Sequence, residues 1–139
     1  MCTHANPRAL LRNPAAPERH LSDDMIRRLA ERGGVIGVVP YNRFLKADWK
    51  DGDNRADVPL TTLINAIDYI CQLTGSAAHV GIGTDFDGGF GAETTPLGFD
   101  TIADLSKIGV ALRERGFSQA DAEGVLANNW LSVLRRGLP

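Results

Sequence analysis

The acidic residue Asp85 stands shortly after an apolar run in the segment HVGIGTDFDG. In parallel α/β architectures, ligands and catalytic groups gather at the C-terminal ends of the strands. A carboxylate at such a place can orient a metal-bound water or move protons. Aspartate is also common in turns. The pattern by itself therefore leaves Asp85 as either a catalytic group or a turn residue.

Three further side chains have positions that suit binding. His4 lies in Thr3-His4-Ala5-Asn6, which could follow the end of a strand, and a neutral imidazole can bind a metal there. Arg19 follows a Pro-rich stretch that could lay its guanidinium across a substrate carboxylate. Tyr41 follows an apolar run and could donate a hydrogen bond to a ligand. The structural alternatives are a surface or core histidine, a solvated arginine and a tyrosine that caps the core.

Apolar runs alternate with helical patterns along the chain, and these elements must position the polar groups. The sequence predicts a helix from Ser22 to Gly33, a strand over Val35–Val39, a long loop over Asn42–Asp57, a helix from Pro59 to Gly75, a strand over His79–Gly83, a Gly-rich loop over Asp85–Gly98, a helix ending at Gly116 and a last helix from Ser118. Strands that alternate with helices predict an α/β fold built of βα units on a parallel sheet.

The predicted strands are too few for a closed parallel barrel. They number two, or three if the residues before His4 end another strand, whereas a (β/α)8 barrel has eight strands and about 250 residues. The sheet would have open edges unless a missing part or a partner chain covers them. His4 also comes directly after the start of the chain with no element before it. We therefore expect a fragment.

The composition argues against several classes of function. The 139 residues are 43% hydrophobic, and 15 Lys and Arg against 17 Asp and Glu leave a net charge of -2, which gives no electrostatic footprint for nucleic acid or an anionic membrane. Cys2 and Cys71 form neither a disulfide framework nor a metal motif, so we expect a reducing, cytoplasmic setting. No run has the character of a signal peptide or the length of a membrane span.

Five blocks, taken together, resemble successive parts of the membrane or renal dipeptidase family, peptidase family M19. They are THANPRAL, RHLSDDMI, ERGGVIGV, HVGIGTDFDG and ANNWLSVL, and they run over almost the whole chain. The resemblance implies a (β/α)8 metal-dependent-hydrolase barrel with a binuclear zinc site, which hydrolyses dipeptides by a metal-bridging hydroxide. It also implies that residues 1–139 correspond to the C-terminal segment of that single barrel domain.

The resemblance assigns roles to particular residues. His4 matches a ligand of the second zinc, and Asp85 matches the acid that contacts the bridging water and the substrate amine and shuttles the proton. Arg19 is the best match for the arginine that binds the substrate's C-terminal carboxylate, with Arg12 as a competitor. Phe44 stands where some relatives have a tyrosine. The family's His-x-Asp pair, bridging glutamate and further histidine have no counterpart in this sequence, so we expect the chain to be inactive alone.

Three alternatives remain at this stage. The chain could belong to a two-chain dipeptidase completed in trans by a complementing N-terminal chain. It could instead be a non-catalytic α/β interaction module that uses its sheet edge to bind another protein or a second copy of itself. A barrel fragment with a phosphate site on its Gly-rich loop ranks last, because DFDG is acidic and would repel phosphate.

Overall fold

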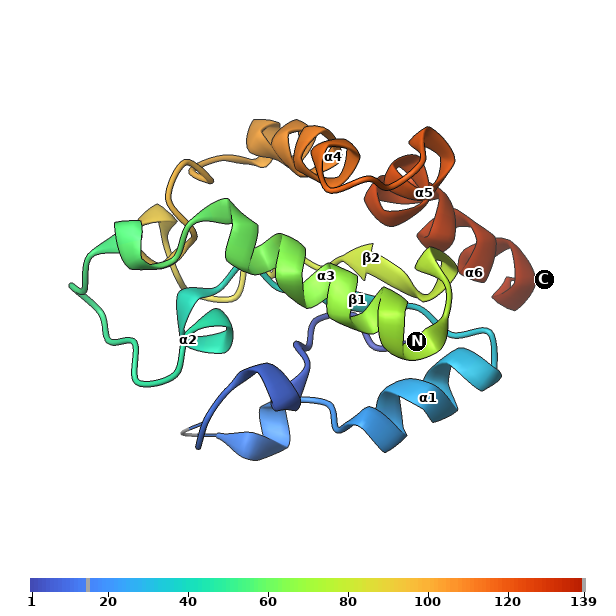
Figure 1. The fold of residues 1–139 in the computed structure, drawn as a ribbon, viewed down its shortest axis with the longest axis horizontal. Coiled ribbons are helices and arrows are strands. Elements are labelled where there is room, and N and C mark those ends of the chain that lie inside the picture. Colours follow the sequence, from blue (N-terminus) through green and yellow to red (C-terminus); the bar gives the residue numbers. More distant parts are fainter. Residues whose placement is uncertain (15, 139) are drawn as a thin grey trace.

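A computed structural model describes residues 1–14 and 16–138, with the elements arranged as in Figure 1. The helices and strands are α1 (Asp23–Glu31), β1 (Ile36–Val38), α2 (Asn42–Leu45), α3 (Leu60–Thr74), β2 (Val80–Ile82), α4 (Leu105–Glu114), α5 (Gln119–Glu123) and α6 (Asn129–Gly137). A π-helical turn, Gly124–Asn128, joins α5 to α6. Short 3-10 helices occupy Arg8–Leu10, Pro17–Arg19, Arg55–Asp57, Ala77–His79, Ala92–Thr94 and Ile102–Asp104.

The predicted parallel sheet is present, and its strands are short. β1 and β2 pair in parallel with Ile36 opposite Val80 and Val38 opposite Ile82. Cys2 forms a further parallel bridge with Ile36, so the residues before His4 do continue the sheet. Three parallel segments, each followed by a connection to a helix, confirm the α/β class.

Helix α3 crosses the sheet at the centre of the molecule and supplies much of the core (Figure 1). Its apolar stripe is fully or almost fully buried and consists of Leu63, Ile64, Ala66, Ile67, Ile70 and Cys71. The helix ends at Gly75, whose left-handed backbone (φ 72°) is the conformation that glycine adopts most easily at a helix end. Ser22 caps α1 by accepting a hydrogen bond from the Met25 N–H, as its sequence position predicts.

The C-terminal helix α6 closes the side of β2 that β1 leaves open. The Asn129 side chain donates to the carbonyl of Val80 at 2.7 Å, and the Trp130 indole N–H donates to the carbonyl of Ile82 at 3.1 Å. The same indole lies against Gly81, where a Cβ would collide with it. The open edge expected from the sequence is therefore covered, at β2, by the chain's own last helix.

Some predicted boundaries are wrong. The stretch Asn42–Asp57 is not one loop, because it begins with α2 and ends with the 3-10 helix Arg55–Asp57. His79 belongs to the 3-10 helix before β2 rather than to the strand. The last predicted helix is divided by the π-helical turn. Within the described residues, no helix has both the length and the apolar character needed to cross a membrane.

Candidate functional site

Three loops that follow the parallel segments meet through a row of aromatic rings. Phe44 contacts Tyr41 edge to face at 5.0 Å between centroids, Tyr41 stacks on Phe90 at 4.6 Å, and Phe90 meets Phe86 edge to face at 6.5 Å. The guanidinium of Arg19 lies over the Phe44 ring, 5.6 Å from its centroid. Because Phe86 directly follows Asp85 in the chain, this row ties the loops of Arg19, Tyr41 and Asp85 to one end of the sheet.

The segment that carries His4 contains one extra residue relative to β1. The Gly37 N–H donates to the Cys2 carbonyl at 2.8 Å, and the next bond back to Gly37 comes from the Ala5 N–H at 2.9 Å. A regular parallel ladder would use the N–H of residue 4, so Thr3 and His4 form a bulge. Without it, His4 would share a face with the buried Val38. With it, the imidazole is half-buried and bonds Thr3 Oγ1 at 2.9 Å.

The Thr3 carbonyl connects this bulge to the end of β2. It lies against both Gly37 and Gly83, at positions where a Cβ on either glycine would collide with it. Gly83 comes two residues before Asp85. The His4 bulge and the Asp85 loop are therefore neighbours at the same end of the sheet.

Asp85 is held in a tight turn with a left-handed backbone. Its φ is 52°, and its carbonyl accepts a hydrogen bond from the Gly88 N–H at 2.8 Å. A Cβ at position 88 would stand 2.8 Å from the Asp85 carboxyl carbon, so glycine there leaves room for the carboxylate. Aspartate tolerates this region better than most residues, yet it is a sparsely populated one that functional sites often use. The side chain is half-buried.

A buried histidine supports the Arg19 loop. His20 is 2% exposed, and its ring meets Phe44 edge to face at 4.9 Å. Burial lowers the pKa of His20, and the nearby guanidinium groups of Arg8 and Arg19 lower it further. Arg8 also donates to the His20 carbonyl at 3.0 Å. His20 therefore packs against the same Phe44 ring over which Arg19 lies.

Asn6 joins the His4 segment to the Tyr41 loop. Its carboxamide is 1% exposed, accepts from the Val39 N–H at 2.8 Å and donates to the Val39 carbonyl at 3.1 Å. It also donates to the Phe44 carbonyl at 3.1 Å. The side chain thus replaces the backbone as the partner of β1 beyond the bulge. Sequence reasoning missed this role, although the signal was available as an amide directly after a strand end.

The donors present do not make a complete metal site. In the described ranges, 1–14 and 16–138, no group of three or more His, Cys, Asp or Glu side chains could hold a metal ion. A catalytic zinc takes about three protein ligands. The described part of the chain therefore does not supply a complete metal centre by itself.

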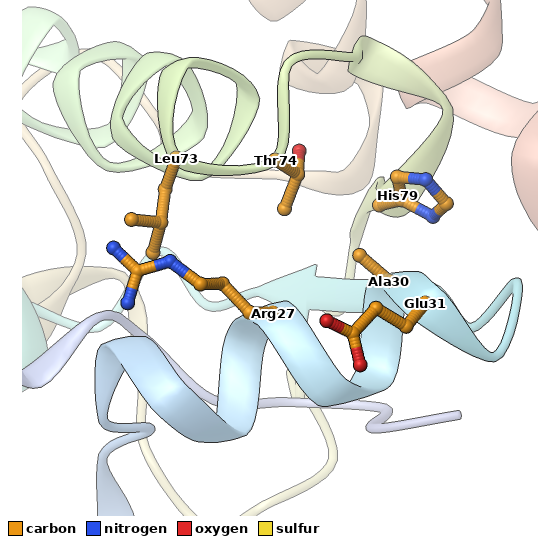
Figure 2. Close-up of a pocket in the computed structure, with 6 residues that line it drawn as sticks. All are labelled: Arg27, Ala30, Glu31, Leu73, Thr74 and His79. Carbon is orange, nitrogen blue, oxygen red and sulfur yellow. The ribbon is translucent and has the colours of Figure 1, made fainter.

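A pocket of about 320 Å³ lies at the opposite end of the sheet (Figure 2). It is lined by Arg27, Ala30 and Glu31 of α1, by Leu73 and Thr74 of α3 and by His79. Since His79 precedes β2 whereas Asp85 follows it, this pocket is separate from the aromatic row. The His79 ring is engaged with the Gly34 carbonyl at 3.0 Å, so this histidine has a structural role.

The chain is similar to several known proteins. A Klebsiella pneumoniae protein described as an uncharacterized protein in the pqqA 5' region is 38% identical over 97% of this chain and 45% of its own length. Dipeptidase aclJ of Aspergillus oryzae is 31% identical over 84% of this chain and 25% of its own. This chain therefore spans less than half the length of these relatives.

Solved structures agree with the sequence comparison. A metallo peptidase from Rhodobacter sphaeroides, liganded with a phosphinate mimic of the dipeptide L-Ala-D-Ala, superposes with a TM-score of 0.78 at 27% identity, over 96% of this chain and 35% of that one. An amidohydrolase from Pseudomonas aeruginosa gives 0.75 at 27% identity, over 95% and 43%. Residues 1–137 also match the family model described as membrane dipeptidase, peptidase family M19. The chain belongs to the membrane dipeptidase family, peptidase family M19.

Proposed function

We propose that this chain is the C-terminal segment of a zinc-dependent dipeptidase barrel and that it is inactive by itself. The observation that carries the proposal is the meeting of the His4, Arg19, Tyr41 and Asp85 segments at one end of a parallel sheet. The incomplete donor set and the coverage of less than half of each relative support the second part. A reducing, cytoplasmic setting stays a prediction, with Cys2 and Cys71 both free.

Each of the four residues has a distinct task in the complete enzyme. Asp85 receives the substrate's ammonium group and carries a proton between the attacking water and the leaving amine. Arg19 binds the substrate carboxylate, and its stacking on Phe44 limits the directions that the guanidinium can take. Tyr41 donates a hydrogen bond to the bound peptide, and His4 is the one zinc ligand that this chain contributes. The other ligands would come from a preceding segment or a complementing chain.

The isolated chain provides the first test. Zinc content by mass spectrometry and hydrolysis of L-Ala-D-Ala should both be at background for the purified 139-residue protein. Stoichiometric binuclear zinc together with turnover that a chelator abolishes would show that the chain is complete in itself. Light scattering would then show whether the active protein is a monomer or contains a second copy.

A fusion provides the second test. The part of the Klebsiella pneumoniae relative that this chain does not match can be joined in frame before Met1, and the fused protein should bind zinc and hydrolyse the dipeptide. Asp85→Asn should lower kcat of the fusion by about a hundredfold or more. Asp87→Asn is the matched control, because Asp87 lies exposed in the same turn, and it should stay within about threefold of the parent. Equal effects of the two changes would remove Asp85 from the reaction.

A further inference from the structure

The pocket between α1 and α3 carries two charged side chains of opposite sign, Arg27 and Glu31. Its volume of about 320 Å³ lies at the small end of the range for ligand sites, about 300 to 1,000 Å³. Within residues 1–14 and 16–138, neither side chain forms an ion pair or a hydrogen bond. Both charges are therefore available to a ligand in the pocket.

The order of the charges along α1 explains why Arg27 and Glu31 do not pair with each other. An acid four residues before a base is the favourable order on a helix, and Asp24 and Arg28 follow it with an ion pair of 2.9 Å. Arg27 and Glu31 have the same spacing in the reverse order, which stabilises a helix less.

The other acid that could pair with Arg27 is already engaged. Asp23 lies four residues before Arg27 and accepts a hydrogen bond from the Tyr69 hydroxyl at 2.8 Å. The Arg27 side chain instead extends from α1 towards Leu73 of α3, across the pocket (Figure 2). Its guanidinium is thus placed along one wall of the pocket.

The remaining walls offer no competing charge. The Thr74 hydroxyl donates to a carbonyl of its own helix at 2.8 Å, and the His79 ring is bonded to a backbone carbonyl before β1 at 3.0 Å. Ala30 and Leu73 supply apolar surface. A ligand therefore meets one cation, one anion and a small apolar area.

We infer that this pocket binds a small α-amino acid as its zwitterion, with the carboxylate on Arg27 and the ammonium group on Glu31. A guanidinium matches a carboxylate in geometry and charge. Glu31 repels a simple anion and Arg27 repels a simple amine, so a ligand that carries both charges is favoured over either. The apolar wall of Ala30 and Leu73 suits a side chain as small as that of alanine.

This site goes beyond the proposed dipeptidase function and does not depend on it. The pocket includes His79, which precedes β2, whereas Asp85 follows β2, so the two sites lie at opposite ends of the sheet. Binding can therefore be measured on the 139-residue protein without any turnover.

The test is a titration with L-alanine followed by the backbone amide signals in NMR. Alanine should shift the signals of residues 27–31 and 73–79 with a dissociation constant on the order of millimolar, because both contacts are solvent-exposed ion pairs. Acetate and ethylamine, which each carry one charge, should bind about threefold more weakly or less. No shift up to about 100 mM alanine, shifts confined to other regions, or equal binding of acetate or ethylamine would overturn the inference.

A charge-removing substitution with a matched control examines the carboxylate contact. Arg27→Gln should weaken alanine binding by about fivefold, the upper value for an exposed pair, because an arginine can bind a carboxylate through two hydrogen bonds. Arg28→Gln makes the same change at the neighbouring exposed arginine, which pairs with Asp24, and should leave the affinity within about twofold. Equal effects of the two changes would contradict the role of Arg27.

A third variant examines the ammonium contact. Glu31→Gln should weaken alanine binding and strengthen acetate binding, since the repulsion of the anion disappears, so that the two probes bind almost equally. Glu31 is exposed, and the variant should keep the far-UV circular dichroism of the parent. A preference for alanine over acetate that survives Glu31→Gln would show that the ammonium group is not bound there.

Discussion

The buried amide of Asn6 offers the sharpest test of how the site is assembled. Asn6→Ala removes three hydrogen bonds and leaves the Val39 N–H, the Val39 carbonyl and the Phe44 carbonyl without that partner. Each hydrogen bond contributes about 1 kcal/mol net, and a buried group left unpaired costs about 1 to 3 kcal/mol. Some of the groups can recover water, because Phe44 is only half-buried. We expect the free energy of unfolding to fall by about 2 to 4 kcal/mol.

The measurement is urea unfolding followed by far-UV circular dichroism, with the loss taken from the shift in midpoint at constant slope. Asn128→Ala is the control, because Asn128 is exposed, and it should change the free energy of unfolding by less than about 0.5 kcal/mol. If Asn6→Ala loses less than about 1 kcal/mol, the carboxamide does not act as a substitute for the backbone, and the reasoning fails.

A second variant separates the two halves of the amide. Asn6→Asp keeps an oxygen that can accept from the Val39 N–H but places a carboxylate oxygen against two carbonyl oxygens. At pH 7 it should therefore destabilise the fold at least as much as Asn6→Ala. Burial against the carbonyl oxygens should raise the pKa of this carboxyl, and its protonated form regains one O–H donor. Part of the lost free energy of unfolding should therefore be recovered as the pH falls towards 5.

Three further outcomes follow from the close contacts and the buried titratable groups. Gly83→Ala brings a Cβ onto the Thr3 carbonyl and should lower the free energy of unfolding, measured in urea, by about 3 kcal/mol or more. Gly89→Ala is the control: its Cβ enters open space at φ 89°, and the loss should be about 1 kcal/mol. Equal losses would contradict the close approach of the Thr3 carbonyl to Gly83. Burial lowers the pKa of His20 in the folded state, so the unfolded chain binds more protons once the pH drops below about 6.5. The free energy of unfolding should therefore decrease below that pH, and His20→Asn should flatten the decrease. Parallel pH profiles of the variant and the parent would contradict this role of His20. Burial raises the pKa of Cys71 to about 12, so a thiol reagent should modify Cys2 first and Cys71 only on unfolding. Modification of both cysteines at the same rate would contradict the burial of Cys71.

The sequence predicts the order of the main elements because their patterns are local. The α3 stripe repeats at helical spacing, and the glycine at position 75 stops it where the structure does. The strands are correctly placed but overextended, because an apolar run does not reveal where backbone pairing stops. His79 illustrates this: it precedes β2 directly, yet a serine cap at position 76 draws it into a 3-10 helix.

The site is less accessible from the sequence, because its contacts join distant parts of the chain. Asp85 and His4 could be nominated from their places after apolar runs, with roles supplied by the family resemblance. The Asn6 bonds to Val39 and Phe44 span 33 and 38 residues, and no local pattern predicts such a pairing. Phe90 stayed unnoticed for the same reason, since its importance arises only from the Tyr41 ring stacked on it.

The bulge at Thr3 and His4 fixes the number of residues that must lie between Cys2 and Ala5. Cys2 and Ala5 are both bonded to β1, one on each side of the extra residue, so the segment cannot slide along β1 without breaking both bonds. Deleting Thr3 would restore a regular ladder, with His4 directly opposite Gly37. A single-codon deletion would therefore change the surroundings of the histidine and remove the carbonyl that lies against Gly83, while Cys2 and Ala5 keep their bonds to β1.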